Sequence, residues 1–339
     1  MKLEKDILIV AMVASLGGCA QNAIVEQDSD NVYTPAKVTK IFPANKNAIN
    51  NLAQNTAYEL SHAAYELHHR ADFSSKVKGI YISQSTLENR EYLQYLINRS
   101  QKAGINTFVI DVNAISNAYE KNILLVKNSG IRYVARVVVF PFGGDRSKVK
   151  SEAYWMKRYR LVDAAINLGA DEIQLDYIRY AASNSASAQN SQDIHEVIRW
   201  FKDKIGNRAK LQIDVFGESS FKESRHIGQH IPTFAPSVDA VCPMLYPSHF
   251  EPFREHARKP YDIIYAALTT LKKQFAGENI PFQLYPYIEL SNYRHSFTDE
   301  QLVGYINSQI RAVEDAQADG WYAWSAGNKY DRLFDMLGG

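Results

Sequence analysis

From residue 77 onward, the sequence alternates between short β-type runs and longer amphipathic stretches with helical spacing. Eight β-type runs are present, at residues 78–82, 106–112, 132–140, 172–177, 211–216, 240–246, 282–288 and 321–324. Helical patterns lie between them, for example at residues 88–102, 153–168, 194–204, 261–274 and 299–318. Strands that alternate with helices predict a parallel sheet, and eight such strands are the number that closes a TIM (β/α)8 barrel.

Four glycines support this pattern, because each lies between a helical stretch and the next strand, where glycine commonly ends a helix. They are Gly104, Gly130, Gly169 and Gly320. The alternative fold is an open doubly wound sheet, but the phosphate-binding Gly-x-Gly-x-x-Gly expected after its first strand is absent. We therefore predict an α/β fold, with the barrel spanning residues 76–339. A composition of 46% hydrophobic and 22% charged residues is sufficient for the large core of such a domain.

Two of the expected strands carry the same unusual polar pattern. Gln174 and Asp176 share one face of their strand, and Gln212 and Asp214 repeat the arrangement on the next one. A buried parallel strand is normally apolar on both faces, so these acids carry a desolvation cost. They are either helix caps or members of buried ion pairs, with Arg179 nearby, or they are a pair of catalytic carboxylates at the mouth of the barrel.

In a TIM barrel, the active site lies at the carboxyl ends of the strands. The polar and aromatic residues expected there combine acids, arginines and flat aromatic rings, as a sugar site does. The residues predicted to bind substrate are Asp111, Arg136, Gln174, Arg179, Tyr246, His249, Tyr285 and Trp324.

Cleavage of a glycosidic bond needs two carboxyl groups, one protonated and one ionised. Neighbouring acids push their pKa values apart, which separates the two roles. We predict Asp176 as nucleophile or base, steadied by Arg136 or Arg179, and Asp214 as general acid. Glu289 and Asp111 are alternatives for either role. A separation of about 5 Å would indicate retention of configuration, and about 6.5–9.5 Å would indicate inversion.

Several motifs, in order, resemble a family of bacterial glycoside hydrolase domains that is largely uncharacterised. They lie at residues 109–112 (VIDV), 171–180 (DEIQLDYIRY), 214–217 (DVFG), 227–229 (IGQ), 239–249 (DAVCPMLYPSH) and 320–330 (GWYAWSAGNKY). The resemblance covers about residues 77–330. It implies a TIM barrel, distantly similar to the α-amylase-like clans, and a hydrolase that acts on carbohydrate.

Two positions depart from the pattern of that family. Asn113 stands where the family usually has a lysine after the second strand, in an Asp-x-Lys motif. On the seventh strand, residues 285–289 read Tyr-Pro-Tyr-Ile-Glu, whereas the family tends to an Arg-Pro-Trp-type segment. Both departures lie in the expected site and bear on substrate preference.

The first 19 residues have the pattern of a bacterial lipoprotein signal. Lys2 and Lys5 precede a short apolar run that ends in Leu-Gly-Gly-Cys19, which resembles a lipobox. The run is too short to span a membrane, which takes about 20 apolar residues. Ala20 follows the cysteine instead of aspartate, which resembles lipoproteins sent to an outer membrane. We therefore predict lipidation of Cys19 and a periplasmic or surface location in the bacterial envelope.

Residues 20–75 are predicted to form a tether with a short helix at 51–70, since they offer little apolar surface to bury. The net charge of +1 gives no electrostatic case for nucleic acid as a partner. With two cysteines, neither a disulfide framework nor a cysteine-rich metal site is expected. No cofactor is predicted either.

A zinc site remains as a rival interpretation, because His226, His230 and His249 with Asp214 are types that bind zinc. Against it, no His-Glu-x-x-His is present, and Gly228 and Pro232 argue against the continuous helix that His226 and His230 would need.

The function predicted from the sequence is a glycoside hydrolase that cleaves a polysaccharide of the cell envelope or extracellular matrix. The main alternative is a non-catalytic carbohydrate-binding lipoprotein that takes part in envelope polysaccharide assembly or export. A purely structural envelope protein would leave the polar strand ends unexplained.

Overall fold

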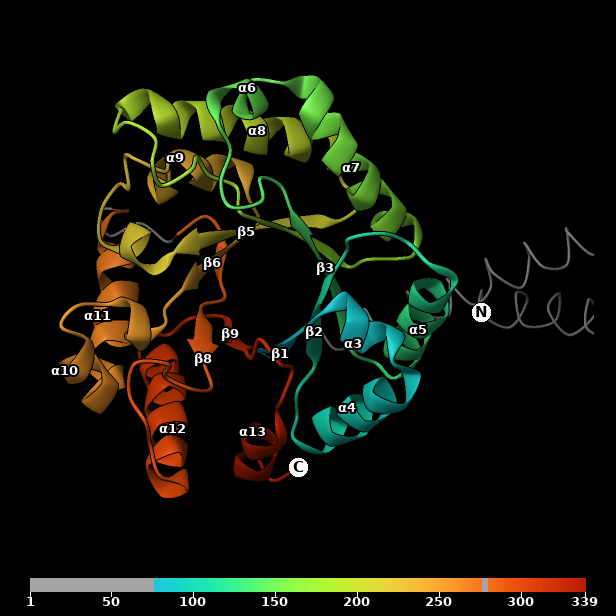
Figure 1. The fold of residues 1–339 in the computed structure, drawn as a ribbon, viewed down its shortest axis with the longest axis vertical. Coiled ribbons are helices and arrows are strands. Elements are labelled where there is room, and N and C mark those ends of the chain that lie inside the picture. Colours follow the sequence, from blue (N-terminus) through green and yellow to red (C-terminus); the bar gives the residue numbers. More distant parts are fainter. Residues whose placement is uncertain (1–75, 276–279) are drawn as a thin grey trace, which may run out of the picture. The chain divides into compact units, whose positions relative to one another are not determined.

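The computed structural model describes residues 76–275 and 280–339 (Figure 1). The predicted signal peptide with Cys19, and the tether with its helix at 51–70, lie outside the described residues. In the part of the chain that is described, no helix is long and apolar enough to cross a membrane.

The strands form one closed, parallel sheet. In chain order they are β1 (Val77–Ile82), β2 (Thr107–Asp111), β3 (Arg132–Val138), β4 (Glu172–Asp176), β5 (Lys210–Phe216), β6 (Ala240–Met244), β7 (Gln283–Leu284), β8 (Tyr287–Glu289) and β9 (Gly320–Trp324). Consecutive strands pair from β1 to β6, both β7 and β8 pair with β6, and β8 and β9 complete the ring to β1. Because β7 and β8 together occupy one position, the sheet is an eight-stranded barrel. The predicted TIM barrel is confirmed.

The seventh barrel strand is broken where the sequence predicts one continuous run at 282–288. Tyr285 still donates its backbone N–H to Val241, but Pro286 has no N–H to give to a ladder. The carbonyl of Pro286 instead accepts from the backbone N–H of Tyr322, at 2.9 Å. The break therefore separates β7, at the closed end of the barrel, from β8 at its mouth.

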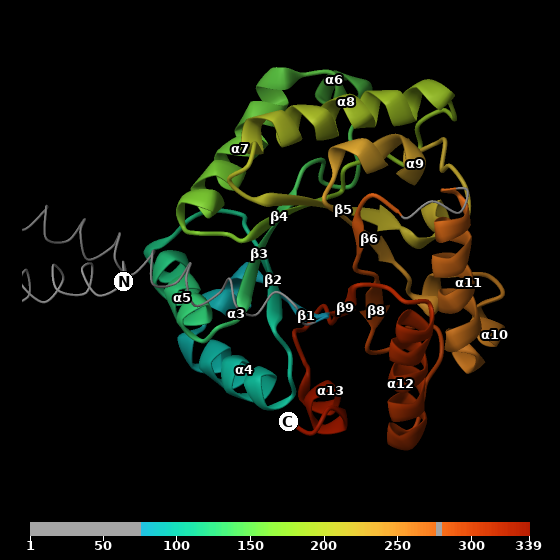
Figure 2. The same ribbon diagram turned by 180° about the vertical axis from the view of Figure 1, so that it is seen from behind.

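Helices surround the ring of strands, as Figures 1 and 2 show from opposite sides. They are α3 (Gln84–Glu88), α4 (Arg90–Lys102), α5 (Asn117–Asn128), α6 (Arg146–Val149), α7 (Glu152–Asn167), α8 (Ala188–Ile205), α9 (Ile231–Phe234), α10 (Phe253–Arg258), α11 (Pro260–Lys273), α12 (Asp299–Asp315) and α13 (Asp331–Met336). Side-chain caps define several of their starts. For example, Thr298 and Gln301 form a capping box at the start of α12.

Three of the four glycines expected to end helices have left-handed φ angles: Gly104 (+69°), Gly130 (+79°) and Gly169 (+80°). The prediction for Gly320 is wrong. This residue is the first of β9, its φ is not left-handed, and a Cβ atom there would come 2.1 Å from the backbone oxygen of Val77 in β1. Gln317, with a φ of +55°, supplies the left-handed residue after α12. Gly320 is needed because the first and last strands approach too closely for a side chain.

The apolar core has two parts. The larger one lies between the strands and the helices and contains residues from both. The smaller one contains strand residues and residues at strand ends, which places it inside the barrel, and it is rich in tyrosine. Its tyrosines are Tyr81, Tyr246, Tyr285, Tyr287 and Tyr322. The interior of this barrel is therefore aromatic and partly polar, where branched aliphatic residues are more usual.

A layer of hydrogen-bonded polar side chains crosses the middle of the barrel, and we call it the glutamine layer. Gln174 of β4 donates to Gln212 of β5 at 3.1 Å, and both side chains are fully buried. Tyr287 donates to Gln174 at 2.8 Å, and Tyr322 lies 3.0 Å from the Gln212 amide nitrogen. Cys242 completes the layer, with its sulfur 3.3 Å from the carbonyl oxygen of Gln212.

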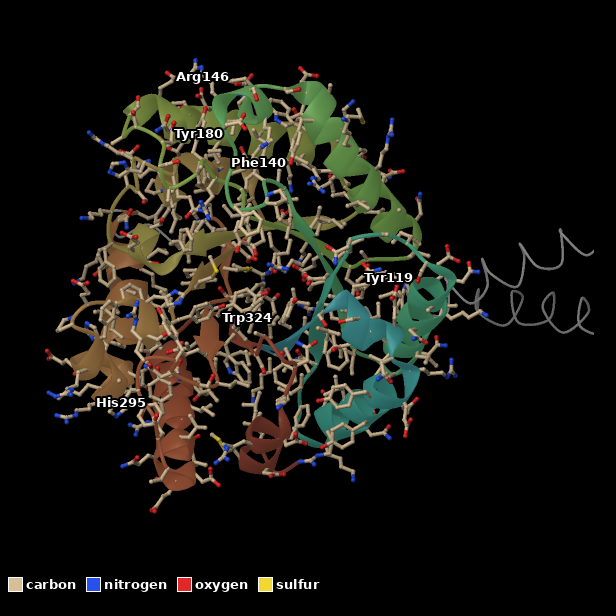
Figure 3. All side chains as sticks on the ribbon, viewed as in Figure 1. Tyr119, Phe140, Arg146, Tyr180, His295 and Trp324 are labelled. Carbon is tan, nitrogen blue, oxygen red and sulfur yellow. The ribbon has the colours of Figure 1, made fainter. Side chains whose placement is uncertain are left out.

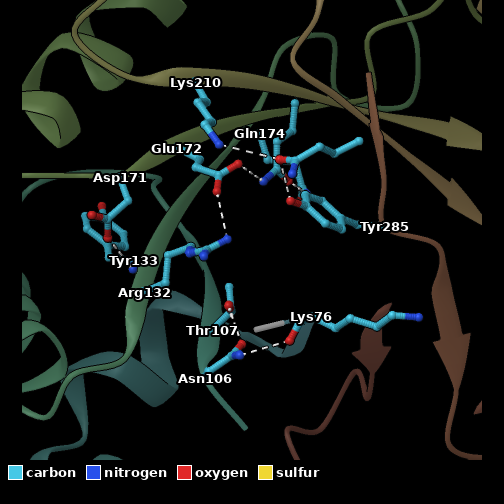
Figure 4. A network of polar contacts seen from close by, with 12 residues as sticks. Lys76, Asn106, Thr107, Arg132, Tyr133, Asp171, Glu172, Gln174, Lys210 and Tyr285 are labelled. Carbon is cyan, nitrogen blue, oxygen red and sulfur yellow. Dashed lines mark hydrogen bonds and ion pairs between the residues drawn. The ribbon is translucent and has the colours of Figure 1, made fainter. Parts of the chain in front are cut away.

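The closed end of the barrel, below this layer, carries a second polar network (Figure 4). Glu172 forms an ion pair with Arg132 at 3.1 Å and accepts from the Gln212 amide at 2.6 Å. Tyr285 and Lys210 lie in the same network, both bonded to Gln283. These contacts satisfy the buried charge of Glu172 within the fold, which indicates a structural role for this end.

Candidate active site

Four charged side chains from neighbouring strands converge at the carboxyl end of the barrel. Asp111 ends β2, Arg136 lies on β3, Asp176 ends β4 and Asp214 lies on β5. The guanidinium of Arg136 forms ion pairs with the carboxylates of Asp111 and Asp176. Its Nε lies 3.8 Å from Oδ2 of Asp214. One cation, only 7% exposed, thus holds three carboxyl groups around it.

Two aromatic rings cover Arg136 on the side of β1 and β9. Tyr81 and Trp324 stack on each other with centroids 4.2 Å apart, and the guanidinium carbon lies 5.4 Å and 5.7 Å from the two ring centres. The Tyr81 hydroxyl donates to Asp111 at 2.5 Å. Burial and then the charge of Asp111 raise the pKa of Tyr81, so its phenol stays a donor. This packing fixes Arg136 and Asp111 in one arrangement.

Asp214 is the most deeply buried acid of the cluster, at 2% exposed. Its Oδ1 has no hydrogen-bond partner among the described residues. Burial, and then the negative charge of Asp176, raise the pKa of Asp214 well above its ordinary value. This shift favours the protonated form of the carboxyl group, which is the form that is able to donate a proton.

Asp176 has a different environment at the end of β4. One carboxylate oxygen forms the ion pair with Arg136, and the other accepts from the backbone N–H of Tyr177 at 2.5 Å. Tyr177 has a left-handed φ of +51°, an unfavourable conformation for a bulky residue. Such outliers cluster at functional sites, where the surrounding structure holds them in place. Here the turn places an N–H against Asp176.

A cavity of about 200 Å³ opens beside these groups. Seven of the residues predicted for the site line it: Arg136, Asp176, Arg179, Asp214, Tyr246, His249 and Trp324. Five further residues complete the lining: Tyr177, Phe216, Gln229, Met244 and Tyr287. The cavity therefore combines two acids and two arginines with mostly apolar and aromatic walls. Figure 3 shows Trp324 among the side chains near the centre of the ring of strands.

Arg179 is held beside the acids by stacking. Its guanidinium carbon lies 5.2 Å from the ring centre of Tyr177 and 4.9 Å from that of Phe216. One nitrogen donates to the backbone oxygen of Tyr180 at 2.9 Å. Arg179 is 8% exposed, and burial lowers its pKa although Tyr177 and Asp176 act in the opposite direction. Its position on the cavity wall suits it to donate to a bound hydroxyl or carboxylate.

Gln229 supports the site from a loop. It accepts from the backbone N–H of Phe216 at 2.8 Å and reaches the backbone oxygen of Asp214 at 3.4 Å. It thereby fixes the end of β5, on which Asp214 lies. Strand periodicity could not identify Gln229, because its loop has no regular pattern.

Three of the residues predicted to bind substrate do not line the cavity. Gln174 belongs to the glutamine layer, and Tyr285 belongs to the network at the closed end. Asp111 lies behind Arg136 and Tyr81 and acts through them.

Glu289, the third residue predicted to be catalytic, is engaged with a neighbouring loop. It accepts from the backbone N–H of Ser248 at 2.9 Å, from the Ser248 hydroxyl at 2.6 Å, and from the Tyr305 hydroxyl. Burial raises the pKa of Glu289, although the donors from Ser248 and Tyr305 lower it in part. It is not among the described residues that line the cavity. Its contacts fix the 3-10 turn Pro247–His249, which carries His249.

The histidines weighed as zinc ligands occupy separate positions. His226 lies 3.3 Å from the backbone oxygen of Asn184, and His230 lies 2.7 Å from the hydroxyl of Thr233. Within residues 76–275 and 280–339, no three His, Cys, Asp or Glu side chains are placed to hold a metal ion.

Three solved structures share this fold at low sequence identity. The PgaB (BpsB) glycoside hydrolase domain from Bordetella bronchiseptica matches with a TM-score of 0.56 and 12% identity, over 77% of this chain and 99% of that chain. The Bacillus cereus spore cortex-lytic enzyme SleL gives 0.55 and 12%, over 78% and 74%. The endo-beta-1,4-mannanase from Thermotoga petrophila gives 0.56 and 12%, over 79% and 76%. A comparison with curated proteins gave no match.

Residues 147–330, more than half of the chain, match a family model described as "Putative glycosyl hydrolase domain". This segment runs from α6 to the loop after β9 and includes Asp176, Asp214 and most of the cavity wall. The chain belongs to this family of glycosyl hydrolase domains, which makes it a glycoside hydrolase with a carbohydrate substrate.

Proposed function

We propose that this protein cleaves glycosidic bonds within a polysaccharide of the cell envelope or extracellular matrix, with Asp176 and Asp214 as its two working carboxyl groups. The observation that carries the proposal is the contrast between these two acids. Asp214 is fully buried with a strongly raised pKa, whereas Asp176 is ion-paired to Arg136. Two carboxyl groups whose environments separate their protonation states meet the requirement of glycoside cleavage.

In the proposed reaction, Asp214 donates its proton to the oxygen of the leaving sugar while the bond from the anomeric carbon to that oxygen breaks. Asp176 either attacks the anomeric carbon directly or removes a proton from a water that attacks it. In both cases the net change is the addition of one water across the bond. Arg136 stabilises the negative charge on Asp176 before the reaction and keeps Asp214 and Asp176 in one cluster.

The cavity walls suit a sugar ring. Trp324 and Tyr246 offer flat apolar faces with polar edges, and Tyr287 adds a third ring, whose hydroxyl is bonded to Gln174. Burial raises the pKa of Tyr246 and Tyr287 well above the usual range, so both phenols stay protonated as donors. Arg179 and His249 add polar groups for hydroxyl or acidic substituents.

The envelope location remains part of the proposal and rests on the sequence motif around Cys19. Lipidation there would anchor the enzyme to a membrane facing the polysaccharides of the envelope. A single acyl signal gives marginal binding, and two or more chains give stable anchoring.

The direct test is product release from purified polysaccharides. The panel contains bacterial exopolysaccharides and envelope polysaccharides, together with β-1,4-mannan and spore cortex peptidoglycan, which the names of two structural neighbours suggest. New reducing ends are measured for the wild type and for the Asp176→Asn/Asp214→Asn double variant. Asp163→Asn, which alters an exposed acid on α7, serves as the matched control.

Release by the wild type and the control, with a loss of about 10²-fold or more in the double variant, would support hydrolysis by these two acids. Equal release by the double variant would remove both acids from the mechanism.

A sugar-binding role without turnover is the second candidate. It is favoured by one observation, namely that both oxygens of Asp176 already accept hydrogen bonds. Retention of one polysaccharide by both the wild type and the double variant, with no release by either, would favour this role over hydrolysis.

A further inference from the structure

The two most exposed large apolar side chains of the described residues both lie at the mouth of the barrel. Phe142 is 86% exposed and lies in the loop after β3, and Tyr293 is 67% exposed and lies in the loop after β8. The other exposed residues of this class lie on the outer helices: Leu124, Met156 and Tyr265. Single exposed apolar residues are common, but two aromatic rings at the active end of a barrel are a pattern.

The strand order places these two loops on opposite sides of the mouth. Moving around the barrel from β3 to β8 crosses β4, β5 and β6 in one direction, and β2, β1 and β9 in the other. Three strands therefore separate the two loops on either side. A straight line between Phe142 and Tyr293 passes over the open end of the barrel, where the acids lie.

A continuous series of aromatic contacts connects the cavity to Tyr293. Tyr246 and His249 line the cavity, and their rings meet edge to face at 5.2 Å. His249 in turn meets the ring of Tyr293 at 5.8 Å. A sugar chain that leaves the cavity along these rings would reach an exposed aromatic face.

The ring of Tyr293 is held in place by its neighbour. The guanidinium of Arg294 lies 4.8 Å from the centre of the Tyr293 ring and 3.9 Å from that of Phe253. Its Nε donates to the backbone oxygen of Ser248 at 2.9 Å. Ser248 is fixed through its N–H and hydroxyl by Glu289. A buried acid that the proposed reaction does not use thus supports the loop that places Tyr293, and such preorganisation favours binding.

Phe142 is also held in a defined conformation. Its φ of +63° is left-handed, which is unfavourable for a bulky residue. The loop is tied down by Gly144, whose N–H donates to the backbone oxygen of Arg179 at 2.9 Å, and by Ala181, whose N–H donates to Gly144 at 3.0 Å. Since Arg179 lines the cavity, the loop that carries Phe142 adjoins the cavity on the side away from Tyr293. Figure 3 labels Phe140 and Tyr180, which lie in these two paired loops.

We propose that Phe142 and Tyr293 are two sugar-stacking platforms, and that the substrate is a glycan of at least three linked sugars that crosses the mouth between them. One sugar occupies the cavity beside Asp176 and Asp214, and one stacks on each platform. The enzyme then holds an internal part of a chain and cleaves it within its length. This inference rests on the proposed carbohydrate site, but it is tested by binding and needs no turnover.

The test measures affinity in the Asp176→Asn background, so that no substrate is consumed. The probes are manno-oligosaccharides and chito-oligosaccharides of two to six sugars, and the purified polysaccharides of the panel described above. Tyr293→Ala, Phe142→Ala and the double variant are compared with Tyr265→Ala, which removes an exposed tyrosine on the outer helix α11. Tyr293→Phe keeps the ring and serves as the conservative variant. Thermal unfolding checks that each protein is folded.

We expect affinity to increase with chain length beyond two sugars and each alanine variant to lose about 3- to 10-fold affinity for the longer probes, the range of one aromatic stacking contact. Tyr265→Ala and Tyr293→Phe should match their background. Unchanged affinity in the double alanine variant, an absence of length dependence, or an Asp176→Asn protein that binds none of the probes would each overturn the proposal. Turnover is measured separately with the wild type. Binding that depends on the platforms without turnover would support the platforms and defeat the proposed hydrolysis.

Discussion

Arg136 is the cation between the carboxyl groups of Asp111, Asp176 and Asp214, of which the last two are buried, so its removal should be costly. In Arg136→Met, a side chain of similar length without charge, the partly buried carboxylate of Asp111 and the buried carboxylate of Asp176 lose their counter-charge. Breaking a buried ion pair by removing one partner costs about 3–5 kcal/mol. Because two carboxylates lose the same partner, we expect a loss of at least about 3–5 kcal/mol in the free energy of unfolding at pH 7.

The assay is urea unfolding at pH 7 and pH 4, followed by fluorescence and circular dichroism. At pH 4 the uncompensated carboxylates can take up protons, which removes the unpaired charge, so the loss should be smaller than at pH 7. Replacing the two acids by neutral amides should have the same effect as protonating them. The triple variant Arg136→Met/Asp111→Asn/Asp176→Asn should therefore regain part of the lost stability.

The matched control is Arg208→Met, whose ion pair with Asp163 is 43% exposed on both sides. It should change stability by less than about 1 kcal/mol. Equal losses in Arg136→Met and Arg208→Met, or a loss of the same size at both pH values, would refute the reasoning.

Four further outcomes are expected. Because the fold raises the pKa of Asp214, its protonated form is favoured, and kcat/KM should fall as the pH rises through that raised value. By thermodynamic linkage, the stability that protonated Asp214 contributes is complete at acid pH and is lost at higher pH. The free energy of unfolding of Asp214→Asn, measured in urea, should therefore rise relative to that of the wild type from pH 5 to pH 9. A difference that does not change with pH would contradict the raised pKa. Gly320→Ala should lower the melting temperature more than Gly304→Ala on α12, since only the first meets the Val77 backbone, and equal shifts would count against the close approach. Cys19→Ser should move the protein from the membrane to the soluble fraction after cell lysis, and continued sedimentation with membranes would argue against lipidation.

The barrel and its acids could be predicted because both follow from simple periodicities. Alternation of strands and helices indicated the fold, and a period of two placed Asp176 and Asp214 on one face of adjacent strands. The same periodicity put Glu289 in phase with Tyr285 and Tyr287. It could not show that Pro286 breaks the strand, or that the hydroxyls of Ser248 and Tyr305 donate hydrogen bonds to the carboxylate of Glu289.

Other parts of the site depend on contacts between distant segments. Tyr81 lies in an ordinary apolar strand, and its role arises from stacking on Trp324, which lies 243 residues further along the chain. Gly320 has the sequence context of a helix end, yet the close approach of β1 decides its role. Such contacts leave no local pattern in a single sequence.

The glutamine layer has a consequence for the relative position of Asp176 and Asp214 along the barrel axis. Gln174 and Gln212 face each other across β4 and β5, and each lies two residues before its acid on the same strand. A slip of β4 along β5 by two residues would preserve the inward faces but separate the two amides, leaving fully buried polar groups unpaired at about 1–3 kcal/mol each. An apolar layer at this height would tolerate such a slip more readily, since apolar contacts have no direction. The two glutamines therefore fix the register of β4 against β5. This register sets the positions of Asp176 and Asp214 relative to each other, and hence the gap in which a glycosidic bond must fit.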